Sequence, residues 1–172
     1  SNIDVLNLFN CDDISSINLH LGNFYCNIEK NFDKGTMYFE TSATQGNSKA
    51  MFNLGKLYYY GNGVHQDYSR AKELFDESAQ NNNSDALVAL GKLYFYGEGV
   101  EKDYSKAKEY FELAVRQNNS EALVSLGNLY FEGKGVKQNF LKAKEYYELA
   151  VQQKNSDALV ALGKLYFYGE GV

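Results

Sequence analysis

The stretch NSDALVALGKLYFYGEGV at residues 83–100 decides the fold, because it recurs without a change at residues 155–172. Related stretches lie before and between these two copies. Their common mark is a Leu-Gly dipeptide that recurs every 36 residues, at Leu54-Gly55, Leu90-Gly91, Leu126-Gly127 and Leu162-Gly163. A tandem repeat of this length is typical of structures in which each unit packs only against its neighbours.

Each unit carries two helical patterns separated by a Gly-x-Gly-Val segment. In residues 85–120, the first half places apolar side chains at i, i+4, i+7 and i+8: Ala86, Leu90, Leu93 and Tyr94. The second half repeats this spacing with Ala107, Tyr110, Phe111, Ala114 and Val115. Both stripes predict amphipathic helices of about 12 residues. The unit is therefore expected to be a helical hairpin.

Polar residues predict the ends of these helices. A serine precedes each first helix, and its hydroxyl could accept from the open N–H groups of the first turn: Ser48, Ser84, Ser120 and Ser156. The expected caps of the second helices are Asn31, Asp67, Asp103 and Asn139. The loop glycines Gly61, Gly97 and Gly133 are expected to end the first helices, because glycine adopts a positive φ freely.

A second set of glycines lies inside the first helices, at Gly55, Gly91, Gly127 and Gly163. Glycine in the middle of a helix costs about 1 kcal/mol relative to alanine, so its recurrence there requires compensation by packing. These positions lie one turn from the Leu/Tyr stripe. We expect an aromatic side chain of a facing helix to lie against the bare backbone at each of them.

The 36-residue unit resembles the Sel1-like repeats, which are relatives of the tetratricopeptide repeat. The resemblance rests on Ala…Leu-Gly-x-Leu-Tyr-x-x-Gly-x-Gly-Val followed by Asp-Tyr, Lys-Ala, Tyr-Phe and Ala-Val, and it is clear over residues 49–172. The pattern predicts an all-α, right-handed α-solenoid of antiparallel helix pairs, curved with a concave face. The expected divisions are 1–12 (capping segment), 13–48 (degenerate first repeat), 49–84, 85–120 and 121–156 (repeats), and 157–172 (first helix of a truncated repeat).

The two ends depart from the repeat. In the first unit, Asn27-Ile28-Glu29 replaces the Gly-x-Gly-Val loop, and residues 3–10 are expected to form a short capping helix or the remains of a preceding one. At the other end, the last helix would present Ala158, Leu162, Leu165 and Tyr166 with part of their packing missing. Two explanations stay open: the chain is a fragment of a longer repeat protein, or its open end pairs with another chain.

Composition argues against several classes of function. Seventeen Lys and Arg against twenty-two Asp and Glu give a net charge of −5, which disfavours nucleic-acid binding. No apolar run approaches the roughly 18 residues of a membrane span, so we expect no insertion into a membrane. The start of the chain does not read as a signal peptide, and two cysteines, Cys11 and Cys26, are too few for a disulfide framework. The cell compartment stays open, with a cytoplasmic location favoured.

No arrangement of side chains predicts catalysis, a cofactor or a metal. His20 and His65 occupy different repeat positions and are expected to be solvated or packed, while Cys26 is expected to be a packed thiol. The Gly-x-Gly segments follow helices rather than strands, so they are read as turns and not as phosphate cradles. Most tyrosines fall on core positions: Tyr58, Tyr94, Tyr130 and Tyr166. We therefore expect a protein that is not an enzyme.

One stripe on the first helices lies opposite the core and varies between repeats. In solenoids of this type, the first helices line the concave side. The stripe is a candidate surface for a partner protein or peptide, since tyrosine offers apolar area with a hydroxyl and lysine pairs with acidic groups. The candidate residues are Asn53, Lys56, Tyr60, Lys92, Tyr96, Asn128, Glu132, Lys164 and Tyr168. Alternatives are an ordinary solvated face on an architectural spacer, or a repeat arm of a larger protein whose activity lies elsewhere. Self-association through the open C-terminal end is a further expectation.

Overall fold

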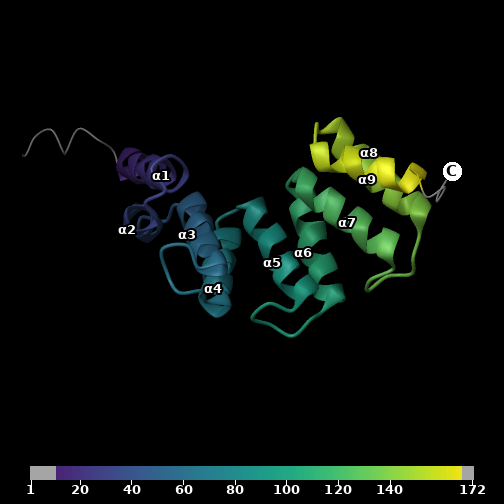
Figure 1. The fold of residues 1–172 in the computed structure, drawn as a ribbon, viewed down its shortest axis with the longest axis horizontal. Coiled ribbons are helices and arrows are strands. Elements are labelled where there is room, and N and C mark those ends of the chain that lie inside the picture. The colour runs from purple at the N-terminus through teal and green to yellow at the C-terminus, as the bar shows by residue number, and fades with distance from the viewer. Residues whose placement is uncertain (1–10, 168–172) are drawn as a thin grey trace, which may run out of the picture. The chain divides into compact units, whose positions relative to one another are not determined.

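The structure, a computed structural model, describes residues 11–167. The expectation of a helix at residues 3–10 and the candidate residue Tyr168 lie outside this range. Helices form in pairs along the described chain, which contains no strand (Figure 1). They are α1 (Cys11–Asn27), α2 (Phe32–Thr44), α3 (Ser48–Tyr60), α4 (Tyr68–Gln80), α5 (Ser84–Tyr96), α6 (Tyr104–Arg116), α7 (Ser120–Glu132), α8 (Phe140–Gln152) and α9 (Ser156–Phe167). The predicted all-α fold of helical hairpins is confirmed.

The chain divides into two compact units, Ser1–Ala86 and Leu87–Val172. In the first unit, α1 packs against α2, α2 against α3, and α3 against α4. In the second unit, α6 packs against α7, α7 against α8, and α8 against α9. Helices that are consecutive in the chain are therefore neighbours in space within each unit, as expected of hairpins that stack in order.

Asparagine, not serine, caps the first helix of each hairpin. The side chain of Asn47 accepts from the backbone N–H of Ala50 at 3.1 Å, and Asn119 accepts from Ala122 at the same distance. Asn83 and Asn155 accept in the same way from the residues two further on. The prediction that Ser48, Ser84, Ser120 and Ser156 are the caps is therefore wrong by one residue, since each serine is already the first residue of its helix.

The caps predicted for the second helices are confirmed. The side chains of Asn31, Asp67, Asp103 and Asn139 each accept from the backbone N–H three residues on, at 2.9 to 3.1 Å. At the other end of the first helices, Gly61 and Gly133 close α3 and α7 in the left-handed conformation, with φ of +71° and +69°. Gly97, which follows α5, also has a positive φ of +76°.

An aromatic ring from the second helix of the same hairpin covers the helix glycines of the first four hairpins. A Cβ atom added at Gly91 would lie 2.4 Å from Cε1 of Phe111, and one at Gly127 would lie 2.3 Å from Cε1 of Tyr147. Phe39 and Phe75 cover Gly22 and Gly55 in the same way. No side chain larger than hydrogen fits between these helices, so the close approach offsets the low helix propensity of glycine. At Gly163 nothing lies within 4 Å.

In each unit, one loop glycine lies against the hairpin before its own. A Cβ atom added at Gly63, in the loop between α3 and α4, would lie 2.5 Å from Cβ of Phe32 in α2. In the second unit, Gly135 approaches Tyr104 of α6 at a corresponding 2.6 Å. Both glycines have a positive φ near +70°. The loop is therefore shaped by contact with the neighbouring hairpin as well as by its own turn.

Of the tyrosines predicted to be core residues, Tyr130 belongs to the core, and Tyr58 and Tyr94 lie at its edge. Tyr94 stacks on Tyr110 with ring centroids 5.6 Å apart, and Tyr130 stacks on Tyr146 at 5.7 Å. A lysine ammonium covers each pair: Lys106 over Tyr94 and Lys142 over Tyr130. Tyr130 is buried, whereas Tyr58 and Tyr94 are half-buried. The prediction is wrong for Tyr166, which is 47% exposed.

The identical segments in α5 and α9 have different surroundings. Leu87 and Val88 of α5 are 7% and 2% exposed, whereas their counterparts Leu159 and Val160 in α9 are each 59% exposed. The expectation of missing packing is wrong for Ala158 and Leu165, which are fully buried in clusters with residues of α7 and α8. Leu162 is partly buried against the same helices. The uncovered apolar residues of α9 are instead Leu159, Val160 and Phe167, together with Tyr166.

Candidate partner-binding groove

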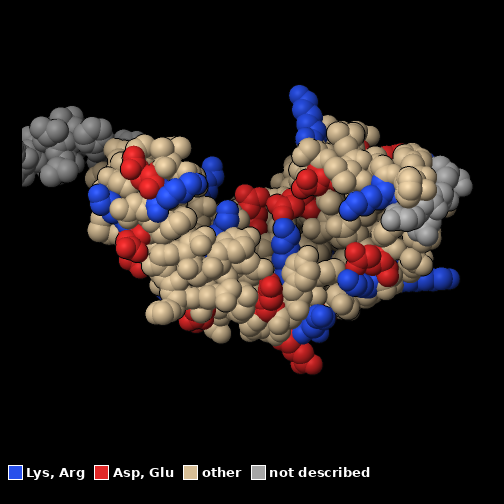
Figure 2. Space-filling model, viewed as in Figure 1, with Lys and Arg blue, Asp and Glu red and all other residues tan. Residues whose placement is uncertain are grey.

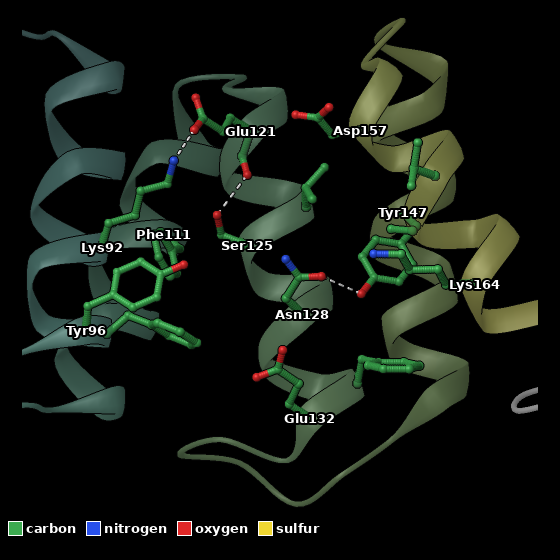
Figure 3. A pocket seen from close by; sticks show the side chains of 15 residues that line it. Lys92, Tyr96, Phe111, Glu121, Ser125, Asn128, Glu132, Tyr147, Asp157 and Lys164 are labelled. Atoms are coloured by element: carbon green, nitrogen blue, oxygen red, sulfur yellow. Dashed lines mark hydrogen bonds and ion pairs between the residues drawn. The ribbon is translucent and has the colours of Figure 1, made fainter. Parts of the chain in front are cut away.

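A groove with a cavity volume of about 450 Å³ runs over the first helices of the second unit. Its walls come from α5, α7 and α9, and the rings of Phe111 and Tyr147, from α6 and α8, lie at its floor (Figure 3). Five of the candidate residues predicted from sequence line it: Lys92, Tyr96, Asn128, Glu132 and Lys164. We call this feature the unit-2 groove.

Acidic residues that sequence reasoning did not select also line the unit-2 groove. Glu121 and Asp157 stand in the first turns of α7 and α9, where a negative charge is also favourable to the helix dipole. Both lie seven residues before a predicted groove residue, Asn128 and Lys164 respectively. Extending the variable stripe by two helical turns toward the N-terminus would have identified them.

Most charges around the groove are already paired. The Lys92 ammonium bonds to the Glu121 carboxylate, which joins α5 to α7 (Figure 3). Lys134, in the loop after α7, pairs with Glu132 at 2.6 Å and lies 4.8 Å from the centroid of the Phe95 ring. On the face shown in Figure 2, acidic and basic side chains are interspersed within each unit rather than sorted by sign. On this face the charges therefore form no single-sign patch for a polyanion.

The floor of the groove contains one buried hydroxyl. The side chain of Tyr147 is 2% exposed, and its hydroxyl donates to Oδ1 of Asn128 at 2.7 Å (Figure 3). Desolvation raises the pKa of Tyr147 well above its ordinary value, so the phenol keeps its proton and remains a donor. Beside it on α7, the Ser125 hydroxyl donates to the backbone carbonyl of Glu121.

The other candidate residues lie on α3 in the first unit. The amide of Asn53 donates to Oδ1 of Asn23 in α1 at 2.9 Å. The Lys56 ammonium lies 5.6 Å from the centroid of the Phe52 ring, and Tyr60 is 61% exposed. These side chains occupy the same repeat positions as those of the unit-2 groove, on a separate unit.

Among the side chains that the structure describes, the titratable residues outside the groove show no arrangement typical of a reaction centre. His20 and His65 are both exposed, and Cys26 is a buried free thiol whose pKa is raised by desolvation. Within residues 11–167, no group of three or more His, Cys, Asp and Glu side chains could hold a metal ion. Nor is any helix there long and apolar enough to span a membrane.

The fold and the groove together define a helical-hairpin repeat protein. The chain belongs to the Sel1 repeat family, whose model matches residues 19–47, 48–83, 84–119, 120–155 and 156–172. The matched repeats begin within one residue of the divisions predicted from sequence for the later units. Proteins with these repeats generally act as scaffolds for protein–protein interaction.

Solved structures of Sel1 repeat proteins have the same fold. A Sel1 repeat protein from Oxalobacter formigenes is 29% identical, with a TM-score of 0.83 over 99% of this chain and 68% of its own. The protein c5321, a protective antigen of uropathogenic Escherichia coli, is 30% identical, with a TM-score of 0.79 over 95% of this chain. This chain spans 38% of the length of c5321.

A more distant structure shows the fold alone. Cysteine-rich protein B of Helicobacter pylori is 22% identical, with a TM-score of 0.58 over 78% of this chain and 97% of its own. A search of curated proteins gives no match. The family and the fold are therefore defined by the comparisons, whereas the partner is not.

Proposed function

We propose that this chain is a non-enzymatic scaffold that holds a segment of a partner protein in the unit-2 groove, on the face predicted to be concave. One observation carries the proposal. Side chains of the candidate stripe on three successive first helices, α5, α7 and α9, surround a single cavity. The helix α7 differs from α5 at four positions, all of which line this cavity, as expected where side chains contact something other than the protein itself: Glu121, Ser125, Asn128 and Glu132.

The chemistry of the groove suits a polypeptide. Tyr96 is 56% exposed at one wall, and an exposed tyrosine is a side chain that protein interfaces favour. Asn128 and Lys164 add hydrogen-bond donors on the other two helices. An aromatic side chain and several separate polar groups fit an extended ligand better than a compact one.

Single substitutions at the walls test the proposal. Short random peptides displayed on phage would be selected against the chain, and the Kd of the enriched peptides would be measured by fluorescence anisotropy. Tyr96→Ala and Lys164→Ala are expected to weaken binding, because they remove an aromatic contact and a cation from the groove. Helicity should stay unchanged by circular dichroism.

Two control variants locate the effect. Glu148→Gln changes an exposed residue of α8 outside the groove, and Tyr60→Ala removes the corresponding tyrosine of the first unit. Both should leave binding unchanged if the unit-2 groove is the site. If Tyr96→Ala and Lys164→Ala bind the peptides as the wild type does, the proposed site is wrong, and the reading as an architectural spacer gains support.

A further inference from the structure

We propose that Asn128 is a fixed hydrogen-bond donor for a main-chain carbonyl of an extended, acidic partner segment, and that Tyr147 is the positioning residue that orients it. This inference rests on the proposed function of the unit-2 groove. It adds the chemistry of the ligand and a role for a buried residue of α8.

The hydroxyl of Tyr147 is not needed to fill the space between the helices. Its ring covers Gly127, and phenylalanine rings cover the equivalent glycines Gly22, Gly55 and Gly91. The chain therefore builds the same packing contact three times without a hydroxyl. In the fourth case, the hydroxyl reaches Asn128 at the floor of the groove.

The bond fixes which way the amide of Asn128 points. The Tyr147 hydroxyl donates its proton to the carbonyl oxygen Oδ1 of Asn128. The NH₂ group then lies on the opposite side of the amide, toward the open groove (Figure 3). Because Tyr147 is buried and its hydroxyl is hydrogen-bonded, rotation of the amide would leave a buried hydroxyl without an acceptor, which is costly.

The residue that follows each helix glycine varies with its surroundings. Lysine follows Gly55 and Gly91, where the covering ring is phenylalanine and offers no hydroxyl. Asparagine follows Gly127, where a tyrosine hydroxyl needs an acceptor that lysine cannot supply. Asparagine also follows Gly22, and there Oδ1 of Asn23 accepts from Asn53. Both asparagines at this position thus have their oxygen occupied and their NH₂ group directed elsewhere.

The groups around Asn128 indicate the ligand. Lys164 lines the groove from α9, and within the described residues it forms no ion pair. Asn128 offers a donor to a carbonyl of the ligand, and Lys164 offers a cation that pairs best with a carboxylate. The main-chain carbonyls of an extended segment are free to accept, whereas those of a helix are used within the helix. An extended segment with an Asp or Glu side chain supplies both a free main-chain carbonyl and a carboxylate.

The test is a double-mutant cycle with the synthetic peptides selected on the wild-type chain. Asn128→Ala removes the donor, and Tyr147→Phe removes only the hydroxyl that orients it. Tyr147→Phe should fold normally, because Phe111 occupies the equivalent position. Each single variant is expected to weaken binding about three- to tenfold, the range for one hydrogen bond, and the double variant should be no weaker than Asn128→Ala.

A second measurement separates orientation from general damage. The side-chain amide signals of Asn128 in a ¹⁵N spectrum should shift when the peptide binds to the wild type, and this shift should be reduced in Tyr147→Phe. Replacing the acidic residue of the peptide by its amide should weaken binding to the wild type but not to Lys164→Ala.

The outcomes distinguish this inference from the function on which it rests. If Tyr96→Ala abolishes binding while Asn128→Ala and Tyr147→Phe leave it intact, the inference is overturned and the groove remains the site. The same holds if the effects of Asn128→Ala and Tyr147→Phe are additive, since Tyr147 would then not act through Asn128. If no groove variant changes the binding of any selected peptide, both proposals fail.

Discussion

Alanine placed at two identical sequence positions should have different effects on stability. Gly91 and Gly163 lie at the same place in the repeated segment LVALGKLYF, so their local sequence is the same. At Gly91, an added Cβ would lie 2.4 Å from Cε1 and 2.7 Å from Cδ1 of Phe111, a ring that is only 2% exposed. At Gly163, the added Cβ would meet nothing within 4 Å.

The difference between the two variants isolates the packing energy. Replacing glycine by alanine within a helix gains about 1 kcal/mol from propensity, and this gain is common to both sites. At Gly91 it is opposed by overpacking, which costs about 1–3 kcal/mol when neighbours must shift. We therefore expect Gly163→Ala to be neutral or stabilising, and Gly91→Ala to be less stable than Gly163→Ala by about 1–3 kcal/mol.

Urea unfolding followed by far-ultraviolet circular dichroism measures this difference. The urea midpoint of Gly91→Ala should fall below that of Gly163→Ala. In the double variant Gly91→Ala/Phe111→Leu, the smaller leucine at position 111 should make room for the alanine and recover part of the lost stability. If both glycine variants raise the midpoint equally, the ring does not confine Gly91, and the account of why glycine recurs inside these helices is wrong.

Three further expectations follow from caps, packing and burial. Asn47→Ala should cost about 1 kcal/mol of unfolding free energy in urea titrations, whereas Ser48→Ala should cost much less, because the asparagine side chain is the cap. Amide exchange followed by NMR should be faster in α9 than in α5 despite their shared sequence, because Leu159 and Val160 are uncovered; equal protection would contradict this. Burial raises the pKa values of Cys26 and Tyr147, so the folded state holds these protons longer than the unfolded state. The free energy of unfolding should therefore decrease as the pH rises above about 9, and it should decrease less steeply in Tyr147→Phe. Urea titrations at several pH values measure this, and a free energy of unfolding that stays constant with pH would contradict the reasoning.

The repeat made most of the fold predictable from sequence. A period of 36 residues and two apolar stripes per unit determine the hairpins, because only helix packing satisfies both. The caps of the second helices were predictable because an Asn or Asp stands alone at each start. At the first helices, two capping residues stand side by side in Asn-Ser, and periodicity does not choose between them.

The groove was predictable only in part. Its helical walls follow from the variable stripe, which gives Lys92, Tyr96, Asn128, Glu132 and Lys164. Its floor comes from the second helices, and their contribution depends on how deeply a ring reaches between two first helices. The hydrogen bond from Tyr147 to Asn128 depends on the length of the tyrosine side chain and the position of its hydroxyl. The periodicity of the sequence does not contain this information.

The approach of Gly63 to Phe32 and of Gly135 to Tyr104 bears on how such a protein can change in length. Each of these two loops packs against a residue of the preceding hairpin. A repeat therefore contains the loop that contacts the repeat before it. Adding or removing whole repeats of 36 residues would keep this type of contact between neighbouring hairpins. Shortening a single loop would remove the contact between two otherwise intact hairpins. Duplication of complete repeats is thus a way to lengthen the protein without loss of these contacts. The identical segments at residues 83–100 and 155–172 are what such a duplication would leave behind.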